Sequence, residues 1–330
     1  MKLLSRLTGC IVGVAVAAIA GTASGQQMRD VAIGLSSGSL IPAPARLAKE
    51  MGLYEKRGLN ARIVMMDSGN AATAALIAGS LNFIVVGPGE QVAAQARGLK
   101  IVTVTSVYSG FSALMVLSKA TVDKLGVSPT APVSERLKAL SGLLIASPSA
   151  TSTYTIGPAG AAKSVGADVR FTYMAQPAMI AALETGAIQG YVSSSPFWAP
   201  PVLKGSAVLW LNGPKGDFPA DNATAHASTL QTTQAFGEAN RDLVKTVITV
   251  FDDFVKALDD RPADVKAAIA KIYPDLDAQT LELLYTTESQ GWKAKPVTAD
   301  DMAREIAFVK AAGSVKLPLD NVDPAAMIFK

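Results

Sequence analysis

Cysteine and histidine are nearly missing from this sequence, and their scarcity excludes several kinds of site. Among 330 residues there is one cysteine, Cys10, and one histidine, His226. An intramolecular disulfide needs two cysteines, and zinc centres of the usual kind need several cysteine or histidine ligands. We therefore expect no disulfide, no metal site and no cofactor.

An excess of charge is also missing. Two of the 30 basic residues, Lys2 and Arg6, lie at the extreme N-terminus, and the others are nearly balanced by 27 acidic residues. The basic runs interleaved with aromatic residues that are typical of nucleic-acid-binding proteins do not occur. The sequence therefore predicts no nucleic-acid partner.

Residues 1–25 have the layout of a secretory signal peptide. Lys2 and Arg6 precede an uncharged apolar stretch, which small residues follow. The most apolar part is about ten residues, against roughly 20 for a membrane span, so we predict cleavage after Ala23 or Gly25. An uncleaved anchor is the alternative.

The segment LTGC, which ends at Cys10, imitates a lipoprotein cleavage box, but the apolar core follows it, so we do not expect lipidation. Removal of Cys10 with the leader would leave no cysteine nucleophile.

The rest of the chain alternates between short apolar runs and helical patterns, which predicts an α/β fold with largely parallel sheets. Two stretches resemble each other, residues 58–86 and residues 166–192. Each has a glycine, a short strand pattern, an Ala-Leu helix with a second glycine, and another strand. Two lobes built on one plan explain this similarity.

Two segments are candidates for crossings between the lobes. Residues 100–119 form a long extended run interrupted near Ser109-Gly110, and residues 206–230 contain apolar stretches broken by Gly, Pro and Asp. We predict that lobe 1 comprises residues 26–109 and 213–330, and that lobe 2 comprises residues 110–212.

A hydroxyl-rich stretch, SPSATSTYT, lies between a predicted strand and a predicted helix at residues 147–155. Free backbone N–H groups at a helix start, with hydroxyls beside them, can hold an oxyanion without lysine or arginine. We predict ligand contacts from Ser149, Thr151, Ser152 and Thr153. Helix capping alone would explain one or two of these residues.

The segment Gly34-Leu35-Ser36-Ser37-Gly38 fits the G-x-S-x-G pattern of a hydrolase nucleophile elbow. A serine hydrolase would use Ser36 with His226 as base, and with Asp168 or Asp217 as acid. The pattern, however, follows the first strand, whereas that enzyme fold places several strands before its elbow. The alternative is a glycine turn that presents Ser36, Ser37 and Ser39 to a cleft.

Two further loops follow predicted strands. Gly87-Pro88-Gly89 would let backbone approach a ligand closely, although a plain turn also fits. The segment SSSPFW at residues 193–198 places Ser194, Ser195 and Trp198 where open α/β sheets bind ligands. Trp198 is either an apolar wall of the site or part of the core. Tyr108, Phe111 and Tyr154 are further aromatic candidates.

The chain resembles the periplasmic solute-binding proteins of ABC importers, in the group for nitrate, taurine, aliphatic sulfonates and thiamine-pyrimidine precursors. The resemblance rests on AKEMGLYEKRGL at residues 48–59, AALIAG at 74–79, QARGLKIV at 95–102 and ALETG at 182–186. Members of the group often have aspartate at the positions of Asn82 and Gln189, which weakens any transfer of ligand identity. The resemblance implies a two-lobed type II fold with a cleft, lined additionally by Gly69 and Asn70.

We therefore predict the extracytoplasmic substrate-binding component of an ABC importer, and not an enzyme. It would be a periplasmic monomer that captures a small organic anion, such as a sulfonate or carboxylate, or a flat heterocycle. Its partners would be an ABC permease and its ATPase. Two alternatives remain, the exported serine hydrolase and a ligand-sensing receptor domain.

Overall fold

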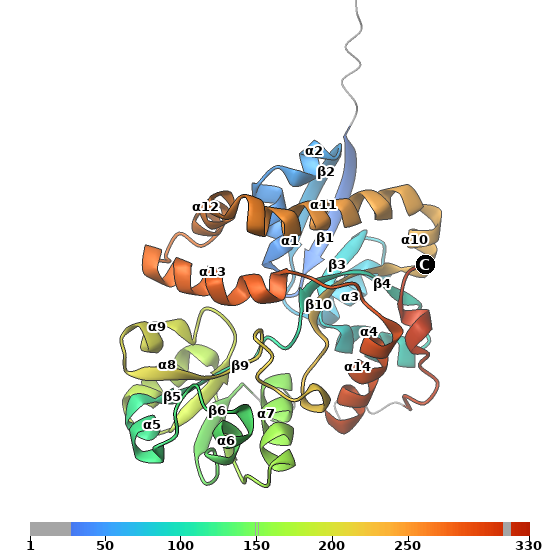
Figure 1. The fold of residues 1–330 in the computed structure, drawn as a ribbon. Helices are drawn as coiled ribbons and strands as arrows, with labels where there is room; N and C mark the ends of the chain where they lie inside the picture. The colour runs from blue at the N-terminus through green and yellow to red at the C-terminus, as the bar shows by residue number, and fades with distance from the viewer. Residues whose placement is uncertain (1–27, 149, 151, 313–317) are drawn as a thin grey trace, which may run out of the picture.

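The chain folds into two lobes, each with a five-stranded sheet flanked by helices, in a computed structural model that describes residues 28–148, 150, 152–312 and 318–330 (Figure 1). The predicted signal peptide, Cys10, Ser149 and Thr151 lie outside the described residues. The predicted two-lobed α/β fold is confirmed. The predicted boundaries between the lobes stay predictions.

The sheet of lobe 1 has the strand order β2-β1-β3-β10-β4. Its strands are β1 (Arg29–Leu35), β2 (Leu59–Met65), β3 (Phe83–Val86), β4 (Ile101–Ser109) and β10 (His226–Thr233). Strand β1 pairs in parallel with β2 and β3, whereas β10 is antiparallel to both β3 and β4. All four residues of β3 are buried, because helices cover both faces of the sheet.

The sheet of lobe 2 repeats this plan with the order β7-β6-β8-β5-β9. Its strands are β5 (Leu114–Ser118), β6 (Leu144–Ser147), β7 (Arg170–Tyr173), β8 (Gly190–Ser193) and β9 (Ala207–Asn212). Strand β6 is parallel to β7 and β8, whereas β5 is antiparallel to β8 and β9. Each sheet is thus mixed, with one reversed strand.

The reversed strands, β5 and β10, are those that the chain enters directly from the other lobe. Strands β4 and β9 end where the chain leaves a lobe, so the carboxyl ends of the parallel strands face the other lobe. A strand that enters from that side must run away from it, and therefore runs antiparallel to its neighbours. The crossings alone account for the departure from parallel sheets.

The helices differ in number between the lobes. Those before the first crossing are α1 (Ala43–Glu50), α2 (Leu53–Lys56), α3 (Gly69–Ile77) and α4 (Pro88–Ala96). Those of the middle segment are α5 (Lys119–Leu125), α6 (Val133–Lys138), α7 (Thr153–Ser164), α8 (Gln176–Glu184) and α9 (Ala199–Leu203). Those after it are the short η1 (Ala220–Asn222), α10 (Gln234–Ala239), α11 (Arg241–Asp260), α12 (Pro262–Ile272), α13 (Ala278–Trp292), α14 (Ala299–Ala312) and η2 (Pro324–Met327). No helix among the described residues is long and apolar enough to span a membrane.

The two crossing segments are hydrogen-bonded to each other through their backbones. The N–H of Gly110 donates to the carbonyl of Ala225 at 2.7 Å, and the N–H of Gly213 donates to the carbonyl of Ala113 at 2.9 Å. At Gly213 the chains come so close that a Cβ atom would lie 2.6 Å from the Ala113 oxygen. Figure 1 shows these two connections running between the lobes.

A second contact between the lobes involves a buried carboxyl group on α13. Glu288 accepts hydrogen bonds from Tyr108 Oη at 2.8 Å and from Ser195 Oγ, which lies in the loop after β8. The indole of Trp198 donates to the same serine at 2.9 Å. Burial raises the pKa of Glu288 to about 7, and both hydroxyl donors oppose the shift. Helix α13 thus rests on lobe 2 as well as on its own sheet.

Replacing Gly213 with alanine is expected to destabilise the protein by about 1–3 kcal/mol, because the added methyl group overlaps the backbone of the other crossing. Guanidinium unfolding measures the change. Gly38→Ala is the matched control, since its Cβ would have only Met65 Cε nearby, at 3.9 Å. Equal losses in the two variants would contradict close packing of the crossings.

Candidate functional site

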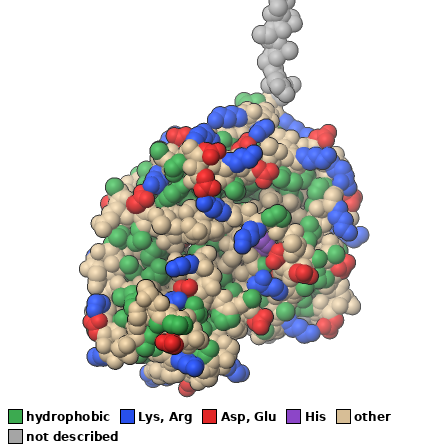
Figure 2. Space-filling model, in the orientation of Figure 1, with side chains coloured by type: hydrophobic (Ala, Val, Ile, Leu, Met, Phe, Trp, Pro, Cys, Tyr) green, Lys and Arg blue, Asp and Glu red, His purple; other side chains and the backbone are tan. Residues whose placement is uncertain are grey.

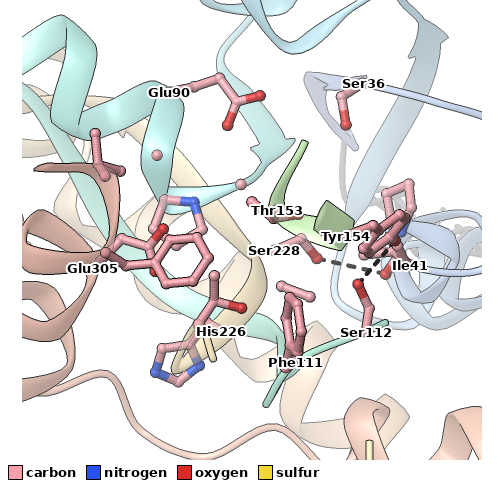
Figure 3. Close-up of a pocket in the computed structure, with 18 of the residues that line it drawn as sticks. Ser36, Ile41, Glu90, Phe111, Ser112, Thr153, Tyr154, His226, Ser228 and Glu305 are labelled. Carbon is pink, nitrogen blue, oxygen red and sulfur yellow. Dashed lines mark hydrogen bonds between the residues drawn. The ribbon is translucent and has the colours of Figure 1, made fainter. Parts of the chain in front are cut away.

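A cavity of about 400 Å³ lies between the lobes, where the parallel strands of lobe 1 end. We call it the interlobe cavity. Its lining is polar on some walls and aromatic on others (Figure 3). The lining residues are Ser36, Ser37, Ile41, Pro42, Asn70, Gly87, Pro88, Gly89, Glu90, Ala93, Phe111, Ser112, Thr153, Tyr154, Ile156, Thr224, His226, Ala227, Ser228, Glu305, Phe308 and Val309.

Turns after strands β1 and β3 build the wall of lobe 1. Ser36 follows the last residue of β1, and its N–H donates to the carbonyl of Val85 in β3 at 3.3 Å. Gly87 follows β3 in an extended conformation, and Pro88 begins α4. Proline suits the first position of a helix, because the N–H that it lacks would have no intrahelical partner. The sequence places Ser36, Ser37, Gly87 and Pro88 here through these local signals.

Helix α7 supplies the wall of lobe 2. Its N-cap is Ser152, whose Oγ accepts the N–H of Tyr154 at 3.2 Å, so this residue acts as a cap and does not line the cavity. Thr153 and Tyr154 line it, together with Asn70 from α3 in lobe 1. Of the predicted hydroxyl cluster, Thr153 is therefore a lining residue.

The other predicted residues within the described part lie beside the cavity or away from it. Ser39 Oγ pairs with Ser37 Oγ at 2.9 Å, and Gly69 packs against the side chain of Glu90. Ser194 donates to Gln176 Oε1 through both its N–H and its hydroxyl. Trp198 is fully buried in the core, and Ser195 is bonded to Glu288. None of these five residues is in the cavity lining.

Three aromatic side chains form the apolar side of the cavity. Phe111 of the first crossing lies between Tyr154 and Phe308, with ring centroids 6.4 and 6.5 Å away. The Tyr154 hydroxyl is 3.1 Å from Ser112 Oγ, and burial raises the pKa of this tyrosine to about 12. Tyr154 is therefore a neutral hydrogen-bonding group at ordinary pH. Of the aromatic candidates, Phe111 and Tyr154 lie here, whereas Tyr108 bonds to Glu288.

Two carboxyl groups in the cavity were not predicted from the sequence. Glu90 is on α4 and Glu305 is on α14, from opposite ends of the chain. Burial raises the pKa of Glu90, and burial with the nearby charge of Glu90 raises the pKa of Glu305 to about 8, against the opposing effect of Arg304. Nothing local marked either residue, because a glutamate in an amphipathic helix is usually exposed.

The imidazole of His226 is not arranged as the base of a serine nucleophile. Its Nδ1 is 2.8 Å from Ser106 Oγ, and its Nε2 is 3.4 Å from Asp301 Oδ2. Ser36 is not among its hydrogen-bond partners, and Figure 3 shows the two residues on different sides of the cavity. Burial lowers the pKa of His226, although Asp301 opposes the shift. The histidine is therefore positioned as a structural residue of β10.

His226 also faces a second, more open cavity of about 720 Å³ on the other side of the crossings. Figure 2 shows the imidazole in a hollow of this face, with charged side chains around it. Asp301 and Arg304 of α14 line this hollow together with Lys295. Within the described ranges, no cluster of three or more His, Cys, Asp and Glu side chains is arranged to hold a metal ion.

Comparison with known proteins identifies a family and several proteins of the same fold. The sequence model of the NMT1-like family matches residues 28–272. A search of curated protein sequences finds no match.

Among solved structures, the chain is similar to the periplasmic aliphatic sulphonate binding protein SsuA from Escherichia coli (20% identity, 91% of this chain and 97% of that one, TM-score 0.69). It is also similar to the alkanesulfonate-binding protein SsuA from Xanthomonas axonopodis pv. citri (18%, 92% and 99%, TM-score 0.63). A third is the periplasmic nitrate-binding protein NrtA from Synechocystis PCC 6803 (11%, 91% and 85%, TM-score 0.59). The predicted resemblance to periplasmic solute-binding proteins is confirmed.

We expect the free energy of unfolding to fall as the pH rises from about 5 to 8, and to fall less in Glu305→Gln. In the unfolded chain, a glutamate with an ordinary pKa of 4.5 loses its proton around that pH, whereas Glu305 in the folded protein keeps its proton to about pH 8. The folded state therefore binds the extra proton in this range, and the stability that it contributes is lost as the pH rises. At pH 8 the glutamine variant should be more stable than the wild type by on the order of 1 kcal/mol or more.

Chemical unfolding at pH 5, 6.5 and 8 measures this difference. The exposed Glu135 provides the matched control as Glu135→Gln, which should follow the wild-type profile. A Glu305→Gln profile parallel to that of the wild type would show that Glu305 has an ordinary pKa in the folded protein.

Proposed function

The chain belongs to the NMT1-like family, and from that premise we propose that it is the extracytoplasmic solute-binding component of an ABC importer. The interlobe cavity carries the proposal, because its walls come from both lobes and from the crossings between them. Its volume of about 400 Å³ is within the range of small-molecule sites. The residues that line it offer hydroxyls, backbone amides and aromatic rings.

Ligand capture would work by favouring a closed arrangement of the lobes. Ser36 and Gly87 line the cavity from lobe 1 and would contact the ligand there, whereas Thr153 and Tyr154 would contact it from lobe 2. A ligand that touches both walls binds the closed arrangement more tightly than the open one, and so shifts the population towards it. The crossings act as the hinge, since they are the only chain connections between the two sheets in the described residues.

Of the two ligand classes that the sequence suggests, a flat heterocycle suits this lining better than a small organic anion. Phe111, Tyr154 and Phe308 provide flat apolar surface. Neither lysine nor arginine occurs among the described lining residues, whereas two carboxyl groups do. Once ionised, these carboxyl groups repel a sulfonate or carboxylate at close range, and for Glu305 this repulsion develops as the pH approaches about 8.

The closed form would be presented to a permease driven by its ATPase, after export of the chain to the periplasm by its N-terminal leader. A single copy suffices for this role, because the cavity is formed within one chain. In this proposal the ligand, the permease and the ATPase belong to one import system.

Gly89→Leu is expected to abolish ligand binding without unfolding the protein. Gly89 lines the cavity in the first turn of α4, and a Cβ atom there would meet Val309 Cγ2 at an ordinary 3.6 Å. The leucine side chain would occupy the cavity volume. A thermal-shift panel of sulfonates, carboxylates, nitrate and pyrimidines identifies a wild-type ligand, since a ligand raises the melting temperature by mass action.

Ala74→Leu, on the exposed side of α3, is the matched control and should keep the full ligand-induced shift. Equal ligand shifts in Gly89→Leu and in the wild type would place binding outside the interlobe cavity. If the wild type hydrolyses generic esters and Ser36→Ala abolishes this turnover, the protein is an enzyme and the proposed binding function is wrong.

A further inference from the structure

The interlobe cavity holds two acidic side chains that form no ion pair with a lysine or arginine among the described residues. We propose that Glu90 and Glu305 form a subsite for a nitrogen cation of the ligand, an amidinium or ammonium group, on the assumption that the proposed binding function is correct. This subsite defines the chemical class of the ligand. It would be a flat organic cation.

Glu305 gives stronger support for the subsite than Glu90 does. Its side chain lines the cavity, the residue is 3% exposed, and its Oε2 atom has no hydrogen-bond partner among the residues that the structure describes. An acceptor that is buried without a partner destabilises the folded protein, and more so when it is charged. A ligand that donates a hydrogen bond to Oε2 would remove this cost. The proposed cation would fill this position, with Oε2 of the ionised carboxylate as its acceptor.

Glu90 lies in a space that two glycines leave open. A Cβ atom at Gly87 would lie 2.8 Å from Glu90 Oε2, and one at Gly69 would lie 2.9 Å from Glu90 Cδ. Any other residue at the end of β3 or the start of α3 would push this carboxyl group away. Figure 3 shows Glu90 of α4 at the top of the view and Glu305 of α14 at its left. The backbone thus makes room for a carboxyl group at the cavity.

The basic residue next to Glu305 in the sequence has other partners than the two acids. Arg304 precedes Glu305, but its guanidinium donates to the carbonyl of Ala220 at 3.2 Å and approaches Asp301 at 4.0 Å. It lines the second cavity and not the interlobe cavity. Only the weakest influence on the pKa of Glu305 comes from this arginine, after burial and Glu90. A cation brought by the ligand would stabilise the ionised form of Glu305.

The surroundings of the carboxyl pair suit a cation attached to a flat ring. Phe308 and Val309 follow Glu305 on α14 by three and four residues, and so lie on the same face of the helix. Phe308 and Phe111 line the cavity beside the acids. A cation near aromatic faces gains further attraction from their electrons. An amidinium on an aromatic ring would meet both requirements.

The family match does not assign this role to Glu305, because it ends at residue 272 and α14 begins at Ala299. Helix α14 is fixed to α4 by an apolar cluster that includes Val92, Met302 and Val309. This packing places Glu305 near Glu90. A segment beyond the matched region thus contributes to ligand choice.

Three probes of nearly the same shape test the subsite: benzamidine, a cation; benzamide, which is neutral; and benzoate, an anion. Isothermal titration calorimetry with the wild-type protein should show binding of benzamidine at least about tenfold tighter than that of benzamide, and none of benzoate. Glu305→Gln and Glu90→Gln should each weaken benzamidine binding by about tenfold or more, and change benzamide binding little. The exposed control Glu135→Gln should match the wild type.

Proton release provides a readout that a merely structural role would not produce. Glu305 is largely protonated at pH 7 in the free protein, with Glu90, Arg304, Tyr154 and His226 as the other ionisable groups around it. A bound cation favours the ionised carboxylate, so benzamidine binding should release protons. Calorimetry at pH 7 in two buffers of different ionisation enthalpy measures this release. It should be smaller in Glu305→Gln.

Benzoate binding in preference to benzamidine, or benzamidine binding that neither glutamine variant weakens, would overturn the cation subsite. Absence of binding by all three probes would overturn it as well. The proposed function is tested separately by the broader ligand panel with Gly89→Leu. If the panel finds an anionic ligand and Gly89→Leu abolishes its binding, the proposed binding function is supported and only the cation subsite is wrong.

Discussion

The backbone pairing of the two crossing segments is the constraint on which the rest of this structure depends. The backbone N–H of Gly110 donates a hydrogen bond to the carbonyl of Ala225, and that of Gly213 donates to the carbonyl of Ala113. Both connections therefore leave and enter the lobes at one place. Strands β4 and β9 must then end at this place, and β5 and β10 must start there. The carboxyl ends of the parallel strands consequently face each other across the gap, with the turns that follow them. A ligand cavity at this position follows from the connectivity of the chain.

The cavity combines a neutral polar wall with an acidic one. The turn after β1 and the start of α7 present hydroxyls and backbone groups, whereas α4 and α14 present Glu90 and Glu305. Buried carboxyl groups without a basic partner reduce the stability of the folded protein, because ionisation in a low-dielectric site is costly. Functional sites commonly carry such a cost, since the interaction that repays it comes from the ligand. The same residues therefore connect stability, pH and ligand choice.

Another buried acid, Glu288, joins the lobes away from the cavity. It lies on α13 and accepts from Tyr108 of lobe 1 and from Ser195 of lobe 2. Unlike Glu305, it has a donor for each carboxylate oxygen. Separation of the lobes at this point would leave the carboxyl group without its Ser195 donor. The arrangement described here is thus stabilised by a polar contact between the lobes as well as by the crossings.

The sequence by itself determined the features that depend on neighbouring residues. The alternation of strand and helix patterns predicted the two-lobed α/β fold, and the polar or glycine residues after the strands predicted cavity positions such as Ser36, Gly87 and Thr153. Only the tertiary structure decided the features that join distant segments. It placed Glu305 near Glu90, put Trp198 in the core and reversed β5 and β10. The physical reason is that burial and charge proximity arise from packing between elements. A local sequence pattern indicates whether a segment is a helix or a strand, but not which other element packs against it.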